Sequence, residues 1–348
     1  MLKNTSKLRK ITVAASIASS FLLSGFAVQA ADKEPIKIGV MLPYSGVYAG
    51  LGEAATNGLK QAIRENGNKI AGRPVEFLLS DTEAKPARAP ELTSAMTDKD
   101  KADFVIGPVH SGVAMGMIKS IRGKDSIMII PNAGINAATG AFCQPNVFRT
   151  SFSSWQTAYP MGAEAVNMGY KKVVTMSWNY GFGKESLAAF EESFEAAGGD
   201  VVKKIFIPFP KTEFQSYLTE IASIKPDAVF VFFAGGGSVK FVKDYEAMGL
   251  KDKIPLIGSG FLTEGTIEAQ GEAAEGLLTT LHYADSLDNP KNKTFRNVRR
   301  TFGNKGEVVL QVFHDLTDIK FQHEEDGFDD PSPNSVAELI KNNGIRFK

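Results

Sequence analysis

A serine that follows an apolar segment could bind an anion. The segment VIGPVHSGVAMGMI, residues 105–118, passes from a predicted strand to a predicted helix, and Ser111 falls at the expected N-cap of that helix. A hydroxyl and the free backbone N–H groups at a helix N-terminus can bind a carboxylate, and the helix dipole favours the negative charge. Simple capping of the helix is the alternative explanation for this serine.

A second strand end would complete this anion-binding group. The segment IIPNAG places Asn132, Ala133 and Gly134 directly after the next predicted strand. If the two strands are neighbours in a parallel sheet, their carboxyl ends lie at one edge, and these residues lie beside Ser111. Backbone amides and small side chains from two strand ends would then meet at one point.

The glycine-containing loops and the histidines do not fit other kinds of chemistry. Gly50, Gly52 and Ala55 have G-x-G-x-x-A spacing, but residues 43–49 separate them from the preceding predicted strand, whereas a dinucleotide fold needs the turn at the strand end. The GGGS run at 235–238 lacks the Lys-Ser/Thr ending of a phosphate loop. The four histidines have no metal-ligand spacing. We therefore predict no cofactor, no metal and no catalytic residue.

Two single residues have ordinary explanations. His110 directly follows a predicted strand end, where a hydrogen-bonding or packing role is more common than catalysis. Cys143 is the only cysteine, so it has no partner for an internal disulfide, and we expect it to pack as a small hydrophobic residue.

The N-terminal segment and the charge balance indicate an exported protein. Four basic residues and no acidic one precede an apolar run that ends at Val28-Gln29-Ala30. This pattern is typical of a secretory signal peptide, predicted over residues 1–30; a retained membrane anchor is the alternative, but serines interrupt the run and it is short for a span. The whole chain has 39 basic and 39 acidic residues, so removal of this segment leaves a net negative protein. Nucleic acid is therefore not an expected partner.

Short apolar segments alternate with helical segments along the rest of the chain. The strands are expected at 36–42, 75–81, 103–108, 126–131, 172–178, 201–209, 227–233, 254–260 and 276–284. These segments are mostly apolar without strict alternation, as in a parallel sheet covered on both faces. Between them, residues 213–223 place Phe214, Tyr217, Leu218 and Ile221 on one helix face. The sequence thus predicts an α/β fold with doubly wound parallel sheets.

A long irregular segment over residues 132–162 divides the chain into two lobes. We expect a second crossing near residues 271–276. On this basis residues 31–150 and about 276–320 form lobe 1, residues 151–275 form lobe 2, and residues 321–348 form an atypical tail with a charged run followed by prolines.

Taken in order, these segments resemble one family, the periplasmic solute-binding proteins of type I fold that serve ABC importers of branched-chain amino acids and related small acids. The resemblance covers roughly residues 34–295 and implies two α/β lobes joined by three crossovers, which close over a ligand without catalysis. It is carried by the stretches IKIGVMLPYSGVYAGLGEAATNGLKQAI, IAGRPVEFLLSDTEAKP, VIGPVHSG, IMIIPNAG, VFRTSF, VVTMSWNYGFGKE, PDAVFVFFAGGG and LKDKIPLIGSGFLTEG.

The resemblance implies roles for residues of lobe 1. Ser111 matches the hydroxyl that receives the ligand carboxylate, and Asn132 and Gly134, on either side of Ala133, match the positions that complete this pocket. The loop from Tyr44 to Gly52, which contains Leu51, matches the rim of the cleft.

The resemblance also implies an aromatic wall in lobe 2. Phe182 is the best match to the family tyrosine, with Trp178 and Tyr180 as near alternatives, and ordinary packing at a strand end is the other explanation for these three residues.

The sequence departs from the family where the ligand would be recognised. Amino-acid binders commonly have an acidic residue for the ligand ammonium, but this sequence has Gly260 there, with Phe261 beside it, and Ala234 replaces a family aromatic residue. An ammonium buried without a counter-charge is costly. These changes favour a carboxylate with an apolar or aromatic body and no amine, unless Glu264 or Asp244 supplies the charge. The chain after Phe295 also leaves the family pattern, so no roles are carried over there.

We therefore expect a monomeric periplasmic protein that traps a small carboxylate, an amino acid or an aromatic acid, between two lobes and delivers it to the membrane permease of an ABC importer. A ligand-binding sensor module for a signalling partner is the alternative, and an exported α/β enzyme is a third.

Overall fold

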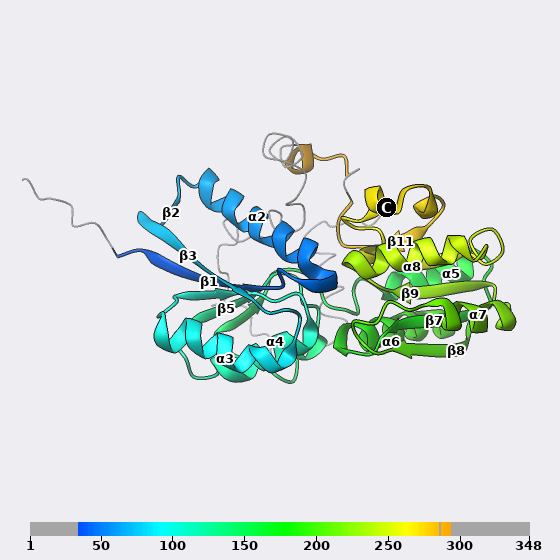
Figure 1. Ribbon diagram of the computed structural model, residues 1–348, viewed down its shortest axis with the longest axis horizontal. Helices are drawn as coiled ribbons and strands as arrows, with labels where there is room; N and C mark the ends of the chain where they lie inside the picture. The colour runs from blue at the N-terminus through cyan, green and yellow to red at the C-terminus, as the bar shows by residue number, and fades with distance from the viewer. Residues whose placement is uncertain (1–33, 285–286, 294–348) are drawn as a thin grey trace, which may run out of the picture.

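The computed structural model describes residues 34–284 and 287–293, which form two lobes, each built on a parallel sheet (Figure 1). The predicted signal peptide, the predicted tail and most of the second segment expected for lobe 1 lie outside these residues. Within the part of the chain that the structure describes, no helix is long and apolar enough to cross a bilayer.

Lobe 1 contains a six-stranded sheet in the order β2-β3-β1-β4-β5-β6, and its strands are parallel apart from the edge strand β2. The strands are β1 (Ile36–Leu42), β2 (Lys69–Ile70), β3 (Arg73–Asp81), β4 (Phe104–Ile106), β5 (Ile127–Ile130) and β6 (Val147–Arg149). The helices are α2 (Ala49–Glu65), α3 (Ala89–Ser94) and α4 (Ser111–Ile121), and a short 3-10 helix, η1 (Gly46–Tyr48), precedes α2.

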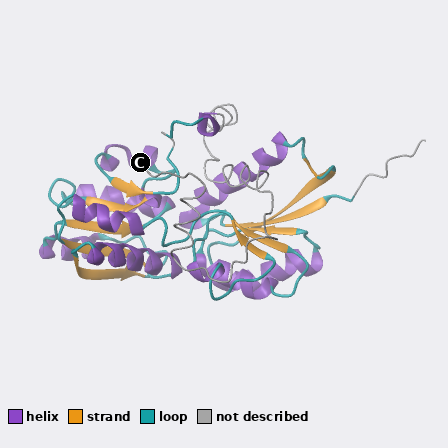
Figure 2. Cartoon of the chain, turned by 180° about the vertical axis from the view of Figure 1, so that it is seen from behind, coloured by secondary structure: helices purple, strands orange, loops and turns teal. Residues whose placement is uncertain are grey.

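The sheet of lobe 1 is covered from both sides because its strands carry apolar residues on both faces. On one face, α3 and α4 pack against Met41, Val105 and Met128. On the other face, Leu59 and Ile63 of α2 join the cluster that contains the alternate β1 residues Ile36, Ile38, Val40 and Leu42. Figure 2 shows α-helices on opposite sides of each sheet.

Lobe 2 contains a five-stranded parallel sheet in the order β11-β10-β9-β7-β8. The strands are β7 (Lys172–Trp178), β8 (Asp200–Ile207), β9 (Ala228–Phe232), β10 (Leu256–Ser259) and β11 (Leu278–Thr280). The helices are α5 (Tyr159–Asn167), α6 (Gly181–Ala196), α7 (Gln215–Ile224), α8 (Gly235–Ala247) and α9 (Ile267–Gln270), and the 3-10 helix η5 (Gly260–Leu262) follows β10.

The predicted strands are all present, and β1 and β7 have the predicted bounds. The short strands β2 and β6 were not predicted. The helix expected at 213–223 is α7, and Phe214, Leu218 and Ile221 are buried as its stripe requires.

The end of lobe 2 differs from the expected boundary. The chain was expected to return to lobe 1 from about residue 276, but Leu278 of β11 pairs with Ile257 of β10, which extends the sheet of lobe 2. The segment therefore belongs to lobe 2 through at least Thr280. The first crossing lies between β6 and α5, inside the irregular segment identified in the sequence.

Trp178, the last residue of β7, is fully buried beneath the N-terminus of α8. Its ring makes edge contacts with Phe209 and Phe233, and a Cβ atom on Gly237 would lie 2.2 Å from it. The absence of a side chain at this helix position is thus required by the packing. Gly236, one residue earlier, is exposed, and a Cβ atom there would have no neighbour closer than 3.7 Å.

Gly237→Ala should destabilise the protein although alanine is the better helix former. The added methyl group forces the Trp178 ring to move, which we expect to cost about 1 to 3 kcal/mol of unfolding free energy in urea denaturation. Gly236→Ala is the matched control and should leave stability unchanged or raise it by up to about 1 kcal/mol. Equal stability of the two variants would contradict this account of the packing.

Candidate functional site

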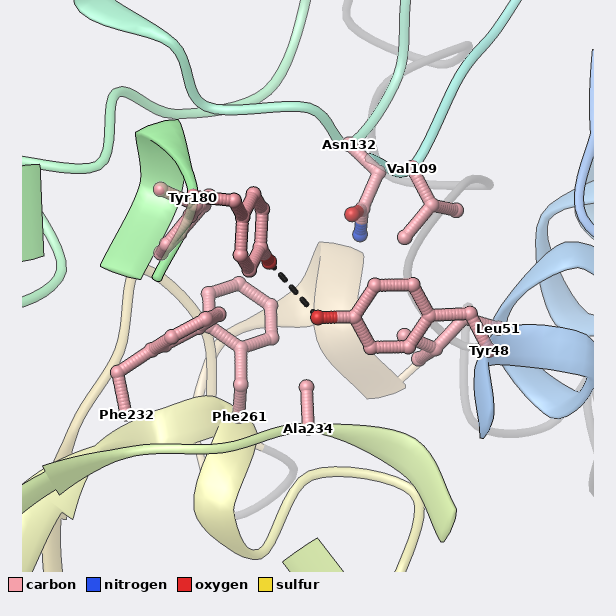
Figure 3. Close-up of a pocket in the computed structure, with 9 residues that line it drawn as sticks. Tyr48, Leu51, Val109, Asn132, Tyr180, Phe232, Ala234 and Phe261 are labelled. Carbon is pink, nitrogen blue, oxygen red and sulfur yellow. Dashed lines mark hydrogen bonds between the residues drawn. The ribbon is translucent and has the colours of Figure 1, made fainter. Parts of the chain in front are cut away.

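A pocket lies between the lobes, at the carboxyl ends of strands from both sheets (Figure 3). This is where α/β sheets bind ligands, because the loops that follow parallel strands converge there. The cavity volume is about 10 Å³, room for roughly one water molecule, so the lining side chains nearly fill the space between the lobes. Nine residues line it: Tyr48, Leu51, Val109, Asn132, Tyr180, Phe182, Phe232, Ala234 and Phe261.

Two neighbouring strands of lobe 1 bring Val109 and Asn132 together. Ile106 of β4 pairs with Ile129 of β5, so the loops after these strands start side by side. Asn132 is 92% buried and directs its amide group into the pocket (Figure 3). It supplies polar hydrogen-bonding atoms to a lining that is otherwise mostly apolar.

Tyr48 and Tyr180 meet across the cleft. Their hydroxyl oxygens are 2.7 Å apart, and Tyr48 comes from η1 of lobe 1 whereas Tyr180 is the N-cap of α6 in lobe 2. Burial raises the pKa of both phenols, so both are protonated at neutral pH. The hydrogen bond between them directly links the two lobes.

Phe182 forms an aromatic wall with two other residues of lobe 2. Its ring stacks on Phe232 with 4.4 Å between ring centroids and meets Phe261 edge-on at 5.5 Å. A Cβ atom on Gly134 of lobe 1 would lie 2.6 Å from the Phe182 ring. Gly134 therefore lies behind this wall and makes room for it, and the glycine does not line the pocket.

Ser111 lies at the boundary between the lobes. It is the first residue of α4, and the N-cap is His110, whose Nδ1 accepts a hydrogen bond from the Gly112 N–H at 3.0 Å. The expected N-cap was thus wrong by one residue, because an imidazole nitrogen takes the capping role. The Ser111 hydroxyl is fully buried, with no hydrogen-bond partner among the described residues.

The N-terminus of α6 packs against Ser111 from the other lobe. A Cβ atom on Gly181, the first residue of α6, would lie 3.2 Å from the Cβ of Ser111. No side chain of the described residues caps α6. Two helix N-termini, each with positive dipole character, therefore face the unpartnered hydroxyl.

Six of the twelve residues predicted for the site line the pocket, and the other six do not. Those that line it are Leu51, Asn132, Tyr180, Phe182, Ala234 and Phe261. Ser111 and Gly134 lie at the lobe boundary, as described above. The remaining four, Tyr44, Ala133, Trp178 and Gly260, are held by packing or hydrogen bonds within their own lobes, and Trp178 also contacts Tyr48 of lobe 1.

Each of these four residues has a structural partner. The Tyr44 hydroxyl is 2.7 Å from the Thr56 hydroxyl, and Ala133 belongs to the core beneath α4. The Trp178 indole N–H donates to the Lys211 carbonyl at 2.8 Å, behind the pocket wall. A Cβ atom on Gly260 would meet Leu281 at 2.4 Å.

Three lining residues were missed in the sequence: Tyr48, Val109 and Phe232. Each lies inside a segment that was singled out, namely the rim loop, the VIGPVHSG segment and the strand at 227–233. Their position in the sequence could have identified them, since Val109 and Phe232 lie at or just beyond a strand end and Tyr48 lies in the rim loop. Residue type alone did not separate these residues from the core.

Among the residues that the structure describes, no acidic or basic side chain lines the pocket. Asp244, one proposed source of negative charge, pairs with Lys240 and accepts a hydrogen bond from Gln215 on the lobe 2 surface. Glu264, the other proposed source, is not among the lining residues. The pocket is therefore aromatic and uncharged.

A carboxylate outside the pocket also joins the lobes. Glu185 of α6 accepts a hydrogen bond from the Asn136 N–H of lobe 1 at 3.0 Å, and Arg149 lies near it. Burial raises the pKa of the Glu185 carboxyl. The hydrogen bond from Asn136 and the nearby charge of Arg149 partly offset this increase. Together with the Tyr48–Tyr180 bond, this contact holds the lobes in a closed arrangement.

The described residues contain no group of three or more metal-ligating side chains.

Cys143 is exposed. The prediction that it packs as a small hydrophobic residue was therefore wrong.

The chain belongs to the periplasmic binding protein family. The sequence pattern described as "Periplasmic binding protein" matches residues 35–307, which include both lobes and every residue of the pocket. A Leu/Ile/Val-binding protein homologue of Brucella melitensis is 33% identical over 287 residues, covering 81% of this chain and 73% of that protein.

Solved structures of similar proteins share the two-lobed type I fold. An ABC transporter solute-binding protein of R. palustris in complex with benzoate has a TM-score of 0.78 and 46% identity, covering 82% of this chain and 79% of that chain. A solute-binding protein of Rhodopseudomonas palustris HaA2 in complex with p-hydroxybenzoic acid has a TM-score of 0.76 and 31% identity, with the same coverage.

His110 should make stability depend on pH. Its ring stacks on Tyr180 of lobe 2, and burial lowers the pKa of the imidazole from 6.5 to about 4. Between these values the unfolded chain binds a proton that the folded protein does not, so stability is present above pH 6.5 and is lost as the pH falls toward 4. We expect wild type to lose about 1 to 2 kcal/mol more unfolding free energy than His110→Asn between pH 7 and pH 5.

Urea denaturation of both proteins at the two pH values measures this difference, and asparagine keeps the capping function at the helix start. The same pH dependence in the two proteins would contradict a neutral, buried His110.

Proposed function

We propose that this protein binds an aromatic carboxylate of the benzoate class between its lobes and delivers it to the membrane permease of an ABC importer. The observation that carries the proposal is a pocket with aromatic walls from both lobes, in which no lining residue of the described chain is charged. Such a pocket suits a flat apolar ring, because aromatic rings contact one another favourably both face to face with an offset and edge to face. The benzoate complex of the relative that is 46% identical supports the same ligand class.

The ligand carboxylate would bind at the boundary formed by Ser111 and the N-termini of α4 and α6. The Ser111 hydroxyl is buried and unpartnered in the described chain, and such a group costs stability until it finds a partner. A carboxylate supplies the acceptor and is favoured by both helix dipoles. Asn132, with its amide directed into the pocket, would hold the carboxylate from the neighbouring strand end.

A ligand with an ammonium group would lack a partner in this pocket. Gly260 replaces the acidic residue that the family resemblance led us to expect, and its place is packed against Leu281. A buried charge without a partner is strongly unfavourable. The pocket therefore favours an aromatic acid over a branched-chain amino acid.

Closure of the cleft would complete the site without any chemical reaction. Tyr48, Leu51 and Asn132 come from lobe 1, whereas Tyr180 and Phe182 come from lobe 2, so the site is complete only when the lobes meet. A ligand that contacts both lobes favours the closed form over the open one, and the permease would recognise that form. In this proposal the protein acts as a periplasmic monomer and not as an enzyme.

Ser111→Ala should weaken the binding of benzoate. Loss of a hydrogen bond to a charged group is expected to reduce the binding free energy by about 1.5 to 3 kcal/mol in isothermal titration calorimetry. Ser120→Ala is the matched control, because this serine is on the same helix and its hydroxyl donates to the Gly116 carbonyl, far from the site. We expect wild type and Ser120→Ala to bind benzoate equally.

Unchanged benzoate affinity in Ser111→Ala would remove this serine from the site. Failure of wild type to bind benzoate or any other aromatic acid would overturn the proposed ligand class.

A further inference from the structure

We propose that the hydroxyl pair of Tyr48 and Tyr180 recognises a hydroxyl substituent on the ring of the bound acid. The proposal rests on the function proposed above and adds to it the residues that distinguish ring-hydroxylated from unsubstituted acids. The observation that carries it is the position of two hydrogen-bonded phenols inside an otherwise aromatic, uncharged pocket.

The pair lies inside the pocket and is shared by the two lobes. Both side chains line the pocket, and their hydroxyl groups point toward each other from opposite sides of it (Figure 3). The two oxygens are 2.7 Å apart. A ligand that fills the pocket must therefore either leave this bond intact or insert a polar group beside it.

The hydrogen-bonding capacity of the pair is only partly used. Each phenol has one O–H donor and can also accept. The bond between them uses one of the two hydrogens, and neither oxygen makes a further hydrogen bond within the described residues. One donor and several acceptor positions are thus left to the pocket. A ring hydroxyl both donates and accepts, so it matches what the pair offers.

The surroundings of the pair favour a neutral group. His110, which stacks on Tyr180 at 4.3 Å between ring centroids, is uncharged at neutral pH because burial lowers its pKa to about 4. Within residues 34–284 and 287–293, no charged side chain lines the pocket. A second carboxylate on the ligand ring would therefore be buried here without a counter-charge. A hydroxyl group is neutral and needs no counter-charge.

In the closed arrangement, aromatic packing between the lobes holds both hydroxyls in place. The Tyr48 ring contacts Trp178 edge-on at 5.8 Å and Phe209 at 5.3 Å. The Tyr180 ring contacts the same Phe209 at 5.3 Å, in addition to His110. Because few side-chain rotations are left to freeze, a hydrogen bond to the ligand loses little entropy.

The test compares ligands that differ only in the ring hydroxyl. Isothermal titration calorimetry of benzoate, 3-hydroxybenzoate and 4-hydroxybenzoate is performed on wild type, Tyr48→Phe and Tyr180→Phe. Removal of one phenolic hydroxyl also removes the bond between the lobes, so it should weaken the binding of every acid, but it should weaken the tighter-binding hydroxybenzoate by about 3- to 10-fold more than benzoate.

Tyr245→Phe is the matched control. Tyr245 is also a buried tyrosine of lobe 2, but its hydroxyl donates to the Ile254 carbonyl at 2.8 Å, outside the pocket. This variant should bind all three acids as wild type does. Thermal denaturation of each variant shows whether it is folded.

Three results would overturn the proposal. In the first, both Phe variants keep the wild-type ratio of hydroxybenzoate to benzoate affinity. In the second, benzoate and the hydroxybenzoates weaken in parallel, which would show that the pair only holds the lobes together. In the third, wild type binds benzoate but neither hydroxybenzoate; failure to bind any of the three acids would instead contradict the proposed function itself.

Discussion

A buried ionic group needs a partner, and this constraint governs the site between the lobes. The pocket has aromatic walls, one amide and two phenols, and none of the described residues that line it is charged. The features that attract an anion lie at its edge, where an unpartnered Ser111 hydroxyl is flanked by the N-termini of α4 and α6. The ligand that satisfies both regions has one carboxylate and an apolar ring. In our proposal its negative charge is held at the lobe boundary, and no described side chain that lines the pocket would compensate a positive charge.

The same residues that form the pocket also join the lobes. Tyr180 stacks on His110 and bonds to Tyr48, and Phe182 packs against Gly134. Ligand affinity and closure therefore depend on one set of contacts, so a change in the pocket alters the equilibrium between open and closed forms as well as the direct contacts. Helices cover both faces of each sheet (Figure 2). The two lobes therefore contact each other at the ends of the strands.

The sequence predicted the parts of the fold that depend on burial. Mostly apolar runs such as Ile36–Leu42, in which Lys37 is the one charged residue, identified the strands, because strands covered on both faces contain mainly apolar residues. The three-residue strand β6 has an exposed Phe148 and gave no such signal. β11 belongs to the sheet of lobe 2 because it pairs with β10. The residues of β11 alone do not indicate this partner. In the site, Trp178, Tyr180 and Phe182 formed one aromatic cluster in the sequence. Which of them faces the cleft is decided by packing, since Trp178 is held under Gly237.

The most direct test of the account compares two ligands that differ only in an ammonium group. Phenylacetate and phenylglycine share a ring and a carboxylate, and isothermal titration calorimetry gives the dissociation constant of each. The account predicts that phenylacetate binds at least about 100-fold more tightly, since an unpaired buried charge costs about 3 kcal/mol or more. Equal or tighter binding of phenylglycine would show that the site contains a partner for the ammonium group and would contradict an uncharged pocket as the basis of recognition.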